Sequence, residues 1–309
     1  MRFWPIGSTI QTRRRFWVRS LAAVLVMGAL GVTLGGCKLF LPPEIRNIEQ
    51  TRGARAQSLE TNHLSSAHDY TVDGRTMHYV EAGTNGAAPL ILFVHGSPGE
   101  WKAWAQYLSD PDLAARAHMI AVDRPGFGGS GAGKVEPSLE QQCRDIAPLL
   151  DRAAPAQRVV LVGHSFGGPV ICRLAMDHPD KVTDLIVLAG SIDPGQEETK
   201  WYQYAAEWRI FRWLVPAELQ TANREIMPLK GGLTEMMPLW PKIRQRVTVI
   251  QGLADNLVPP ENADFAQRMM INARPLEIIR IPGMNHFLPW KQYRLVKEKI
   301  LEHLRQNLN

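Results

Sequence analysis

A short apolar run followed by Gly-x-Ser-x-Gly constrains this chain more than any other stretch of its sequence. Val159–Val162 is four consecutive branched or leucine side chains, typical of a strand buried on both faces of a parallel sheet. Gly163-His164-Ser165-Phe166-Gly167 follows, and then apolar residues at helical spacing, Val170, Ile171, Leu174 and Ala175. Glycines two positions either side of the serine avoid a Cβ collision in so sharp a turn. The pattern predicts an exposed, nucleophilic Ser165 beside a helix N-terminus, the alternative being a serine that only caps the helix.

The residues from Gly163 to Gly168 resemble the nucleophile elbow of the α/β-hydrolases, and an earlier loop resembles another motif of this family. His95-Gly96-Ser97-Pro98-Gly99 follows an apolar strand at 89–94 and is similar to the family's His-Gly-x-Pro loop. The resemblance implies that the backbone N–H groups of Ser97 and Phe166 form an oxyanion hole. We expect His95 to be structural, holding this loop by hydrogen bonds.

Two later loops extend the resemblance to a catalytic triad. A strand at 247–250 leads to Gly252-x-x-Asp255, similar to the family's triad-acid loop, and a strand at 276–281 leads to the His286 loop. The resemblance implies Ser165 as nucleophile, His286 as the base that takes its proton, and Asp255 as the residue that fixes the imidazole tautomer. Asp193 is the rival acid, because it also ends a strand and some relatives draw the acid from that place.

The order of strands and helices predicts the α/β class: a mostly parallel sheet flanked by helices, the α/β-hydrolase fold, over residues 68–309. Residues 68–80 alternate around Asp73-Gly74, which indicates an antiparallel pair at the sheet edge. The alternation lapses between Asp193 and Lys242, where this family commonly carries a lid. We therefore expect a helical lid at about 193–242.

The expected lid is rich in large apolar side chains. Its aromatic and methionine residues are Trp201, Tyr202, Tyr204, Trp208, Phe211, Trp213, Met227, Met236, Met237 and Trp240. One interpretation is a helical insertion that buries them in a small core of its own. The other is that some of them line an apolar acyl pocket.

Residues 1–36 are typical of a targeting segment. They contain five arginines and no acidic residue, and end in a 14-residue apolar run, short for a membrane span of about 20 residues. Leu34-Gly35-Gly36-Cys37 resembles a bacterial lipobox, in which the cysteine becomes lipidated, and Thr12–Trp17 resembles a twin-arginine export signal. The alternative is an uncleaved anchor helix.

These features predict the location of the protein. We expect lipidated Cys37 to anchor it to a membrane of the bacterial cell envelope, facing the periplasm, with residues 37–67 as a tether. Lys38 is not the aspartate associated with inner-membrane retention, so the outer membrane is favoured.

Charge and composition point away from other partners. The five arginines of the targeting segment account for the whole net charge of +5, so nucleic acid is not indicated as a partner. No metal-binding motif occurs among the nine histidines, and we expect neither a metal nor a cofactor. Cys143 and Cys172 are expected as small buried hydrophobic residues, with a disulfide as the alternative.

Serine at the elbow disfavours the dehalogenase and epoxide-hydrolase branches of the family, which use aspartate there. The resemblance implies a serine hydrolase with a small-molecule ester substrate, a carboxylesterase that acts on small to medium apolar esters through an acyl-Ser165 intermediate. A carbon–carbon bond hydrolase or a perhydrolase could use the same triad. A non-catalytic, lipid-tethered binding protein is the alternative from another class.

Overall fold

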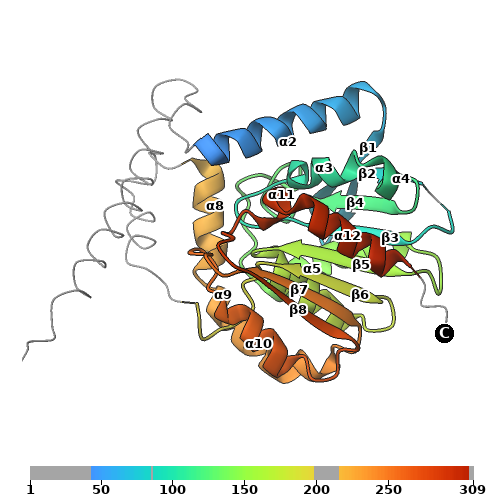
Figure 1. Ribbon diagram of the computed structural model, residues 1–309. Helices are drawn as coiled ribbons and strands as arrows, with labels where there is room; N and C mark the ends of the chain where they lie inside the picture. The colour runs from blue at the N-terminus through green and yellow to red at the C-terminus, as the bar shows by residue number, and fades with distance from the viewer. Residues whose placement is uncertain (1–42, 85, 198–215, 306–309) are drawn as a thin grey trace, which may run out of the picture.

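A single mixed sheet forms the centre of the molecule in the computed structural model, which describes residues 43–84, 86–197 and 216–305. The strands are β1 (Ser65–Val72), β2 (Arg75–Gly83), β3 (Leu90–Val94), β4 (His118–Val122), β5 (Val159–His164), β6 (Asp184–Leu188), β7 (Arg246–Gly252) and β8 (Leu276–Ile281). Their order in the sheet is β1-β2-β4-β3-β5-β6-β7-β8 (Figure 1). Strands β3 to β8 pair in parallel, whereas β2 is antiparallel to both β1 and β4. The prediction of a mostly parallel sheet with an antiparallel edge pair is confirmed.

Helices cover both faces of this sheet. The α-helices are α2 (Pro43–Thr61), α3 (Ala105–Leu108), α4 (Pro111–Ala114), α5 (Leu139–Ile146), α6 (Gly167–Asp177), α8 (Ala217–Ile226), α9 (Leu229–Met236), α10 (Glu261–Met269), α11 (Leu288–Lys291) and α12 (Tyr293–Leu304). The 3₁₀-helices are η2 (Trp101–Trp104), η3 (Ala147–Arg152) and η5 (Met237–Lys242). Helices α2, α3 and α12 pack on one face, and α5, α6 and α10 on the other (Figure 1).

The central strand β5 shows why its sequence is apolar throughout. Val159 and Leu161 pack into the core on the side of α5 and α6, whereas Val160 and Val162 pack into the core on the side of α3 and α12. Successive side chains of a strand point to opposite faces, so a sheet covered on both sides needs apolar residues at every position. The continuous apolar run is therefore the sign of a doubly covered strand.

The structure corrects the expected tether at 37–67. Within the described residues, Pro43–Thr61 is helix α2, and β1 begins at Ser65. Ala56 and Leu59 are fully buried against the side of the sheet that carries α3. The side of this helix that faces the domain includes Arg52, whose guanidinium lies over the Trp290 ring at 5.5 Å. A charged residue at this position interrupts the hydrophobic periodicity from which an amphipathic helix is predicted.

The predicted lid lies partly outside the described residues. Trp201, Tyr202, Tyr204, Trp208, Phe211 and Trp213 belong to that part. In the described part, α8, α9 and η5 follow one another, and the side chains of Met236 and Trp240 are fully buried in the core on the side of α6. Trp240 packs edge-on against Phe265, with ring centroids 5.3 Å apart. These two residues belong to a packed core, and the lid itself stays a prediction.

The remaining sequence predictions concern two cysteines, which the structure describes, and the targeting segment, which lies outside the described residues. Cys143 and Cys172 are both buried and free, as expected for small hydrophobic residues, and burial raises the pKa of both thiols. The targeting segment 1–36 and Cys37 lie outside the described residues. None of the helices in the described part of the chain is long and apolar enough to cross a membrane.

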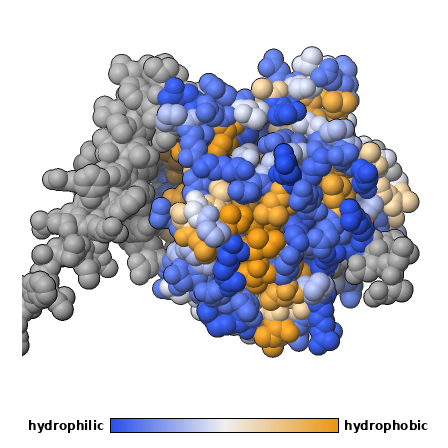
Figure 2. Space-filling model, viewed as in Figure 1, coloured by the Kyte–Doolittle hydropathy of each residue, from blue (hydrophilic) through white to orange (hydrophobic). Residues whose placement is uncertain are grey.

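Strand β8 forms one open edge of the sheet. Hydrophobic side chains gather on the face of the molecule shown in Figure 2, over the region where β8 lies in Figure 1. Within β8, Ile278, Ile279 and Ile281 are half-buried. Glu277 and Arg280 bring charge to the same strand, and charged side chains on an edge strand oppose pairing with another chain.

The packing of α2 generates a prediction about stability. Leu59→Ala should lower the free energy of unfolding by about 2–4 kcal/mol, because it removes a fully buried side chain and leaves a cavity. The measurement is chemical denaturation, with Gln57→Ala as control, because Gln57 is exposed on the same turn of the helix. A loss no greater for Leu59→Ala than for Gln57→Ala would show that α2 does not pack on the domain.

Candidate active site

Ser165 stands at a sharp turn between the end of β5 and the start of α6. Its φ of +54° lies in the left-handed region, which is unfavourable for a residue with a side chain. The turn is held by hydrogen bonds from the Ser165 N–H to the Leu188 carbonyl (3.0 Å) and from the Gly168 N–H to the Ser165 carbonyl (2.9 Å). The strand–serine–helix arrangement expected from the sequence is therefore present.

The glycines around Ser165 are required by close contacts between backbones. A Cβ at Gly163 would lie 2.4 Å from the Gly167 carbonyl oxygen, and one at Gly167 would lie 2.3 Å from that of Val94. A Cβ at Gly168 would lie 2.7 Å from Gly190 Cα. Separations this short are incompatible with any side chain, so the turn brings the ends of β3, β5 and β6 together.

The loop after β3 lies directly against Ser165. A Cβ at Gly96 would lie 2.9 Å from Ser165 Cβ, which places the Gly96–Ser97 peptide beside the serine. Within the described residues, neither the Ser97 N–H nor the Phe166 N–H donates a hydrogen bond. Phe166 also precedes the first turn of α6, where the helix dipole favours negative charge. Both predicted oxyanion donors are thus uncommitted in this part of the chain, on segments that meet at Ser165.

Asp255 and His286 come together from the loops after β7 and β8. His286 Nδ1 lies 2.8 Å from Asp255 Oδ2, and both side chains are buried. Asp255 Oδ1 accepts hydrogen bonds from the backbone N–H groups of Leu257 and Val258, both at 2.9 Å. With Nδ1 donating to the carboxylate, His286 carries its free lone pair on Nε2, the atom that would accept a proton from a nucleophile. No hydrogen bond joins Ser165 Oγ to His286 within the described residues.

Backbone contacts fix these two loops to each other. The Ala254 N–H donates to the Met284 carbonyl at 2.9 Å. A Cβ at Gly252 would lie 2.3 Å from the same carbonyl oxygen, so the loops approach as closely as a glycine allows. The distance between Asp255 and His286 is therefore set by main-chain packing and not by their side chains alone.

The rival acid Asp193 lies in a different environment. Its Oδ1 accepts from the Gly195 N–H at 2.8 Å, and its Oδ2 lies 3.9 Å from the guanidinium of Arg268. Among the described residues it makes no hydrogen bond or ion pair with His286. The geometry favours Asp255 as the acid.

His164 is a part of the site that sequence reasoning did not single out. Its Nε2 donates to the His286 carbonyl at 3.0 Å, and the two rings lie 4.7 Å apart, centroid to centroid. Trp290 packs edge-on against His164 at 5.3 Å. Burial, and then the nearby His286, lower the pKa of His164 well below its ordinary value, so it is neutral. Its position directly before the elbow serine was the available sequence signal.

His95 lies in the loop at residues 95–99 that carries the predicted donor Ser97, called the oxyanion loop from here on, and both of its ring nitrogens make hydrogen bonds. It is fully buried, and its Nε2 accepts a hydrogen bond from the Arg124 backbone N–H at 2.9 Å. Its Nδ1 lies 2.7 Å from the Gly96 carbonyl oxygen and therefore carries the proton. Burial and the charge of Arg124 lower the pKa of His95 well below its ordinary value.

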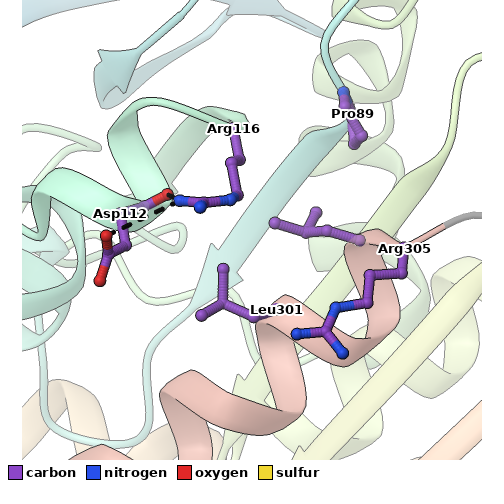
Figure 3. A pocket seen from close by; sticks show the side chains of 6 residues that line it. Pro89, Asp112, Arg116, Leu301 and Arg305 are labelled. Atoms are coloured by element: carbon purple, nitrogen blue, oxygen red, sulfur yellow. Dashed lines mark hydrogen bonds and ion pairs between the residues drawn. The ribbon is translucent and has the colours of Figure 1, made fainter.

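Metal binding and one cavity remain to be described. Among the described residues, no group of three or more His, Cys, Asp or Glu side chains could hold a metal ion. A cavity of about 400 Å³ is lined by Pro89, Asp112, Arg116, Leu301, Leu304 and Arg305. Figure 3 shows Arg116 turned toward Asp112, to which it is bonded. Pro89 precedes β3 whereas the oxyanion loop follows it, so this cavity lies at the opposite end of the strand from Ser165.

Comparisons with known proteins identify the fold. The family model described as "alpha/beta hydrolase fold" matches residues 89–226, which include Ser97, Phe166 and Ser165. The crystal structure of an enol-lactonase from Burkholderia xenovorans LB400 superposes with a TM-score of 0.59 over 77% of this chain and 100% of its own, at 18% identity. The chain has the α/β-hydrolase fold.

Two other proteins similar to this chain cover different shares of it. Epoxide hydrolase 3 of Xenopus tropicalis is 38% identical over 117 residues, which are 37% of this chain and 31% of the relative. The chain spans about a third or less of the length of the first curated relatives it matches. The crystal structure of a membrane phospholipase A described as a bacterial virulence factor has a TM-score of 0.61 at 17% identity, covering 95% of this chain and 99% of its own.

The site geometry generates a prediction that separates the two candidate acids. If the site is a serine-hydrolase triad, Asp255→Asn should lower kcat on an ester substrate by about 10⁴-fold, because an amide at this position favours the tautomer that leaves no lone pair on His286 Nε2. Asp193→Asn should leave kcat within threefold of the wild type, since Asp193 contacts Arg268 instead. Steady-state kinetics on an aryl ester measure both. A loss confined to Asp193→Asn would move the acid to the loop after β6.

Proposed function

We propose that this protein is a serine hydrolase, and specifically a carboxylesterase acting on esters with a small to medium apolar acyl group. The observation that carries the proposal is the 2.8 Å contact between Asp255 and His286. It lies at the carboxyl ends of the parallel strands, where Ser165 also lies, with its backbone in the left-handed region. The two uncommitted backbone N–H groups beside Ser165 add a place for the oxyanion of the tetrahedral intermediate.

The chemistry follows from these positions. His286 Nε2 takes the proton of Ser165 as its Oγ attacks the ester carbonyl, and the N–H groups of Ser97 and Phe166 receive the negative oxygen. His286 then returns the proton to the leaving alcohol, which gives an acyl-Ser165 intermediate. Water activated by His286 attacks the acyl group in the second half of the reaction. Asp255 stabilises the imidazolium that forms in both halves. A hydrogen bond between nucleophile and base, here Ser165 and His286, often forms only in the substrate complex.

Serine at the elbow supports a carbonyl substrate over an epoxide. An aspartate nucleophile opens an epoxide to an ester, which water can hydrolyse, so the enzyme is regenerated. Ser165 would instead form an ether, which has no carbonyl for water to attack. The chemical class of the nucleophile therefore favours esters, although epoxide hydrolases are among the relatives of the chain.

The first prediction of this proposal concerns the substrate. Hydrolysis of an aryl ester series should be fastest for acyl chains of about two to six carbons, because the expected lid of some fifty residues would enclose only a modest pocket. Ser165→Ala should abolish hydrolysis and labelling by a fluorophosphonate. Activity that rises beyond six carbons would contradict the chain-length claim, and ester hydrolysis by Ser165→Ala would contradict the mechanism. Wild-type protein that is inert to the fluorophosphonate would favour a non-catalytic binding protein.

The second prediction concerns the membrane anchor, which we also propose to be lipidated Cys37. Helix α2 begins at Pro43, and Glu44 bonds to Asn285, next to His286, at 3.0 Å and to Lys291 at 2.6 Å. An anchored Cys37 would therefore hold the candidate site within about 25 Å of chain from the membrane surface. Cys37→Ser should give an uncleaved or mislocalised precursor on fractionation and immunoblotting, whereas Cys143→Ala should not. A Cys37→Ser protein of mature size in the membrane fraction would exclude the anchor.

A further inference from the structure

Arg124 is a fully buried cation that takes no part in the mechanism above. It lies two residues after the end of β4 and forms a bidentate ion pair with Glu225 of α8, which is also fully buried, at 2.7 and 2.9 Å. Its remaining donors bond to the side chain of Gln142 and to the carbonyls of His95 and Gly96, all at 2.9 Å. All five N–H bonds of the guanidinium are used, so its orientation is fixed.

One of these contacts acts on the oxyanion loop. The Gly96 carbonyl belongs to the same peptide unit as the Ser97 N–H, and in a planar trans peptide the two groups point in opposite directions. This carbonyl accepts hydrogen bonds from Arg124 Nη2 at 2.9 Å and from His95 Nδ1 at 2.7 Å. Fixing the carbonyl fixes the direction of the Ser97 N–H. A charged donor on the carbonyl also polarises the peptide, which strengthens its N–H as a donor.

Arg124 also contacts the residue that supplies the second donor. Its guanidinium carbon lies 4.5 Å from the centroid of the Phe166 ring and 5.0 Å from that of Phe127. An arginine over an aromatic ring is an attractive contact that restricts both groups. One buried side chain therefore contacts both segments that carry the uncommitted N–H groups.

We propose that Arg124 is a positioning residue for the oxyanion hole, acting through the Gly96–Ser97 peptide and the Phe166 ring, and that Glu225 holds it in place. The inference rests on the proposed function and names what orients its oxyanion donors. Glu225 neutralises the guanidinium, so the effect is one of orientation and peptide polarisation and not of net charge at the site. The catalytic contact with the oxyanion stays with the backbone N–H groups.

The test uses a variant from which both buried charges are removed, because Arg124→Met alone leaves Glu225 unpaired in the core. In Arg124→Met/Glu225→Gln, kcat per active site for an aryl ester should fall by about 10- to 100-fold, less than the 10²- to 10³-fold loss of a whole donor. KM should change less than twofold. Active sites are counted by the end point of fluorophosphonate labelling, so misfolded protein does not enter kcat.

A second readout separates orientation of the oxyanion hole from a purely structural role. The inhibition constant of a trifluoromethyl ketone, whose adduct with Ser165 carries an oxyanion, should rise by the same factor as kcat/KM falls. Arg124→Lys keeps the charge but cannot make every contact, and should lie between the wild type and the double variant. A structural role would instead lower the fraction of labelled sites and leave kcat per site and the inhibition constant unchanged.

The control is another arginine–carboxylate pair, in which Arg158 Nη1 contacts both carboxylate oxygens of Asp184 (3.0 and 2.8 Å) at the opposite end of the parallel strands. Arg158→Met/Asp184→Asn should lower the midpoint of denaturation without changing kcat per labelled site. Wild-type protein that neither hydrolyses esters nor reacts with the fluorophosphonate would overturn the proposed function, and this inference with it. An active wild type matched within threefold by Arg124→Met/Glu225→Gln would overturn this inference alone.

Discussion

The close approach of backbones around Ser165 is the constraint on which the rest of the site depends. Gly163, Gly167 and Gly168 each lie where a Cβ would collide with main chain of a neighbouring segment. Because that space holds no side chain, the ends of β3, β5 and β6 meet, and the serine between them is forced into left-handed geometry. The loops after the parallel strands share this edge of the sheet, so a nucleophile there is within reach of groups from several loops.

Most of this site could be predicted from the sequence because its requirements are local. The patterns that predict a doubly buried strand, flanking glycines and a following helix all lie within about ten residues of Ser165. The loops that carry Ser97, Asp255 and His286 are predicted because each follows an apolar strand. The contact between Asp255 and His286 spans 31 residues, yet parallel pairing of β7 with β8 brings their loops together. The sequence pattern alone left both Asp255 and Asp193 as candidates for the triad acid, and the chain order typical of the family favoured Asp255.

The features that could not be predicted are those in which a charged residue occupies a buried position. Arg52 interrupts the inward stripe of α2, so the sequence of this segment is polar, although the Arg52 guanidinium lies over the Trp290 ring. Glu225 has the sequence character of a surface helix residue, and its partner Arg124 lies 101 positions earlier. The sequence around Arg124 does not predict its ion pair with Glu225, and neither does the sequence around Glu225. Long-range pairing of charges is settled by tertiary packing, which hydrophobic periodicity does not encode.

The buried histidines around the triad complete the electrostatic design of the site. A cationic His164, with its ring 4.7 Å from that of His286, would oppose the imidazolium that the proposed mechanism forms on His286. Burial lowers the pKa of His164, and of His95 in the oxyanion loop, so both act as neutral hydrogen-bond partners. In the proposed mechanism the Asp255 carboxylate, bonded to His286 Nδ1, would then stabilise the imidazolium without competition from these two rings. Burial of polar side chains is costly for stability, but here it would keep these two histidines neutral beside the charge that the proposed mechanism places on His286.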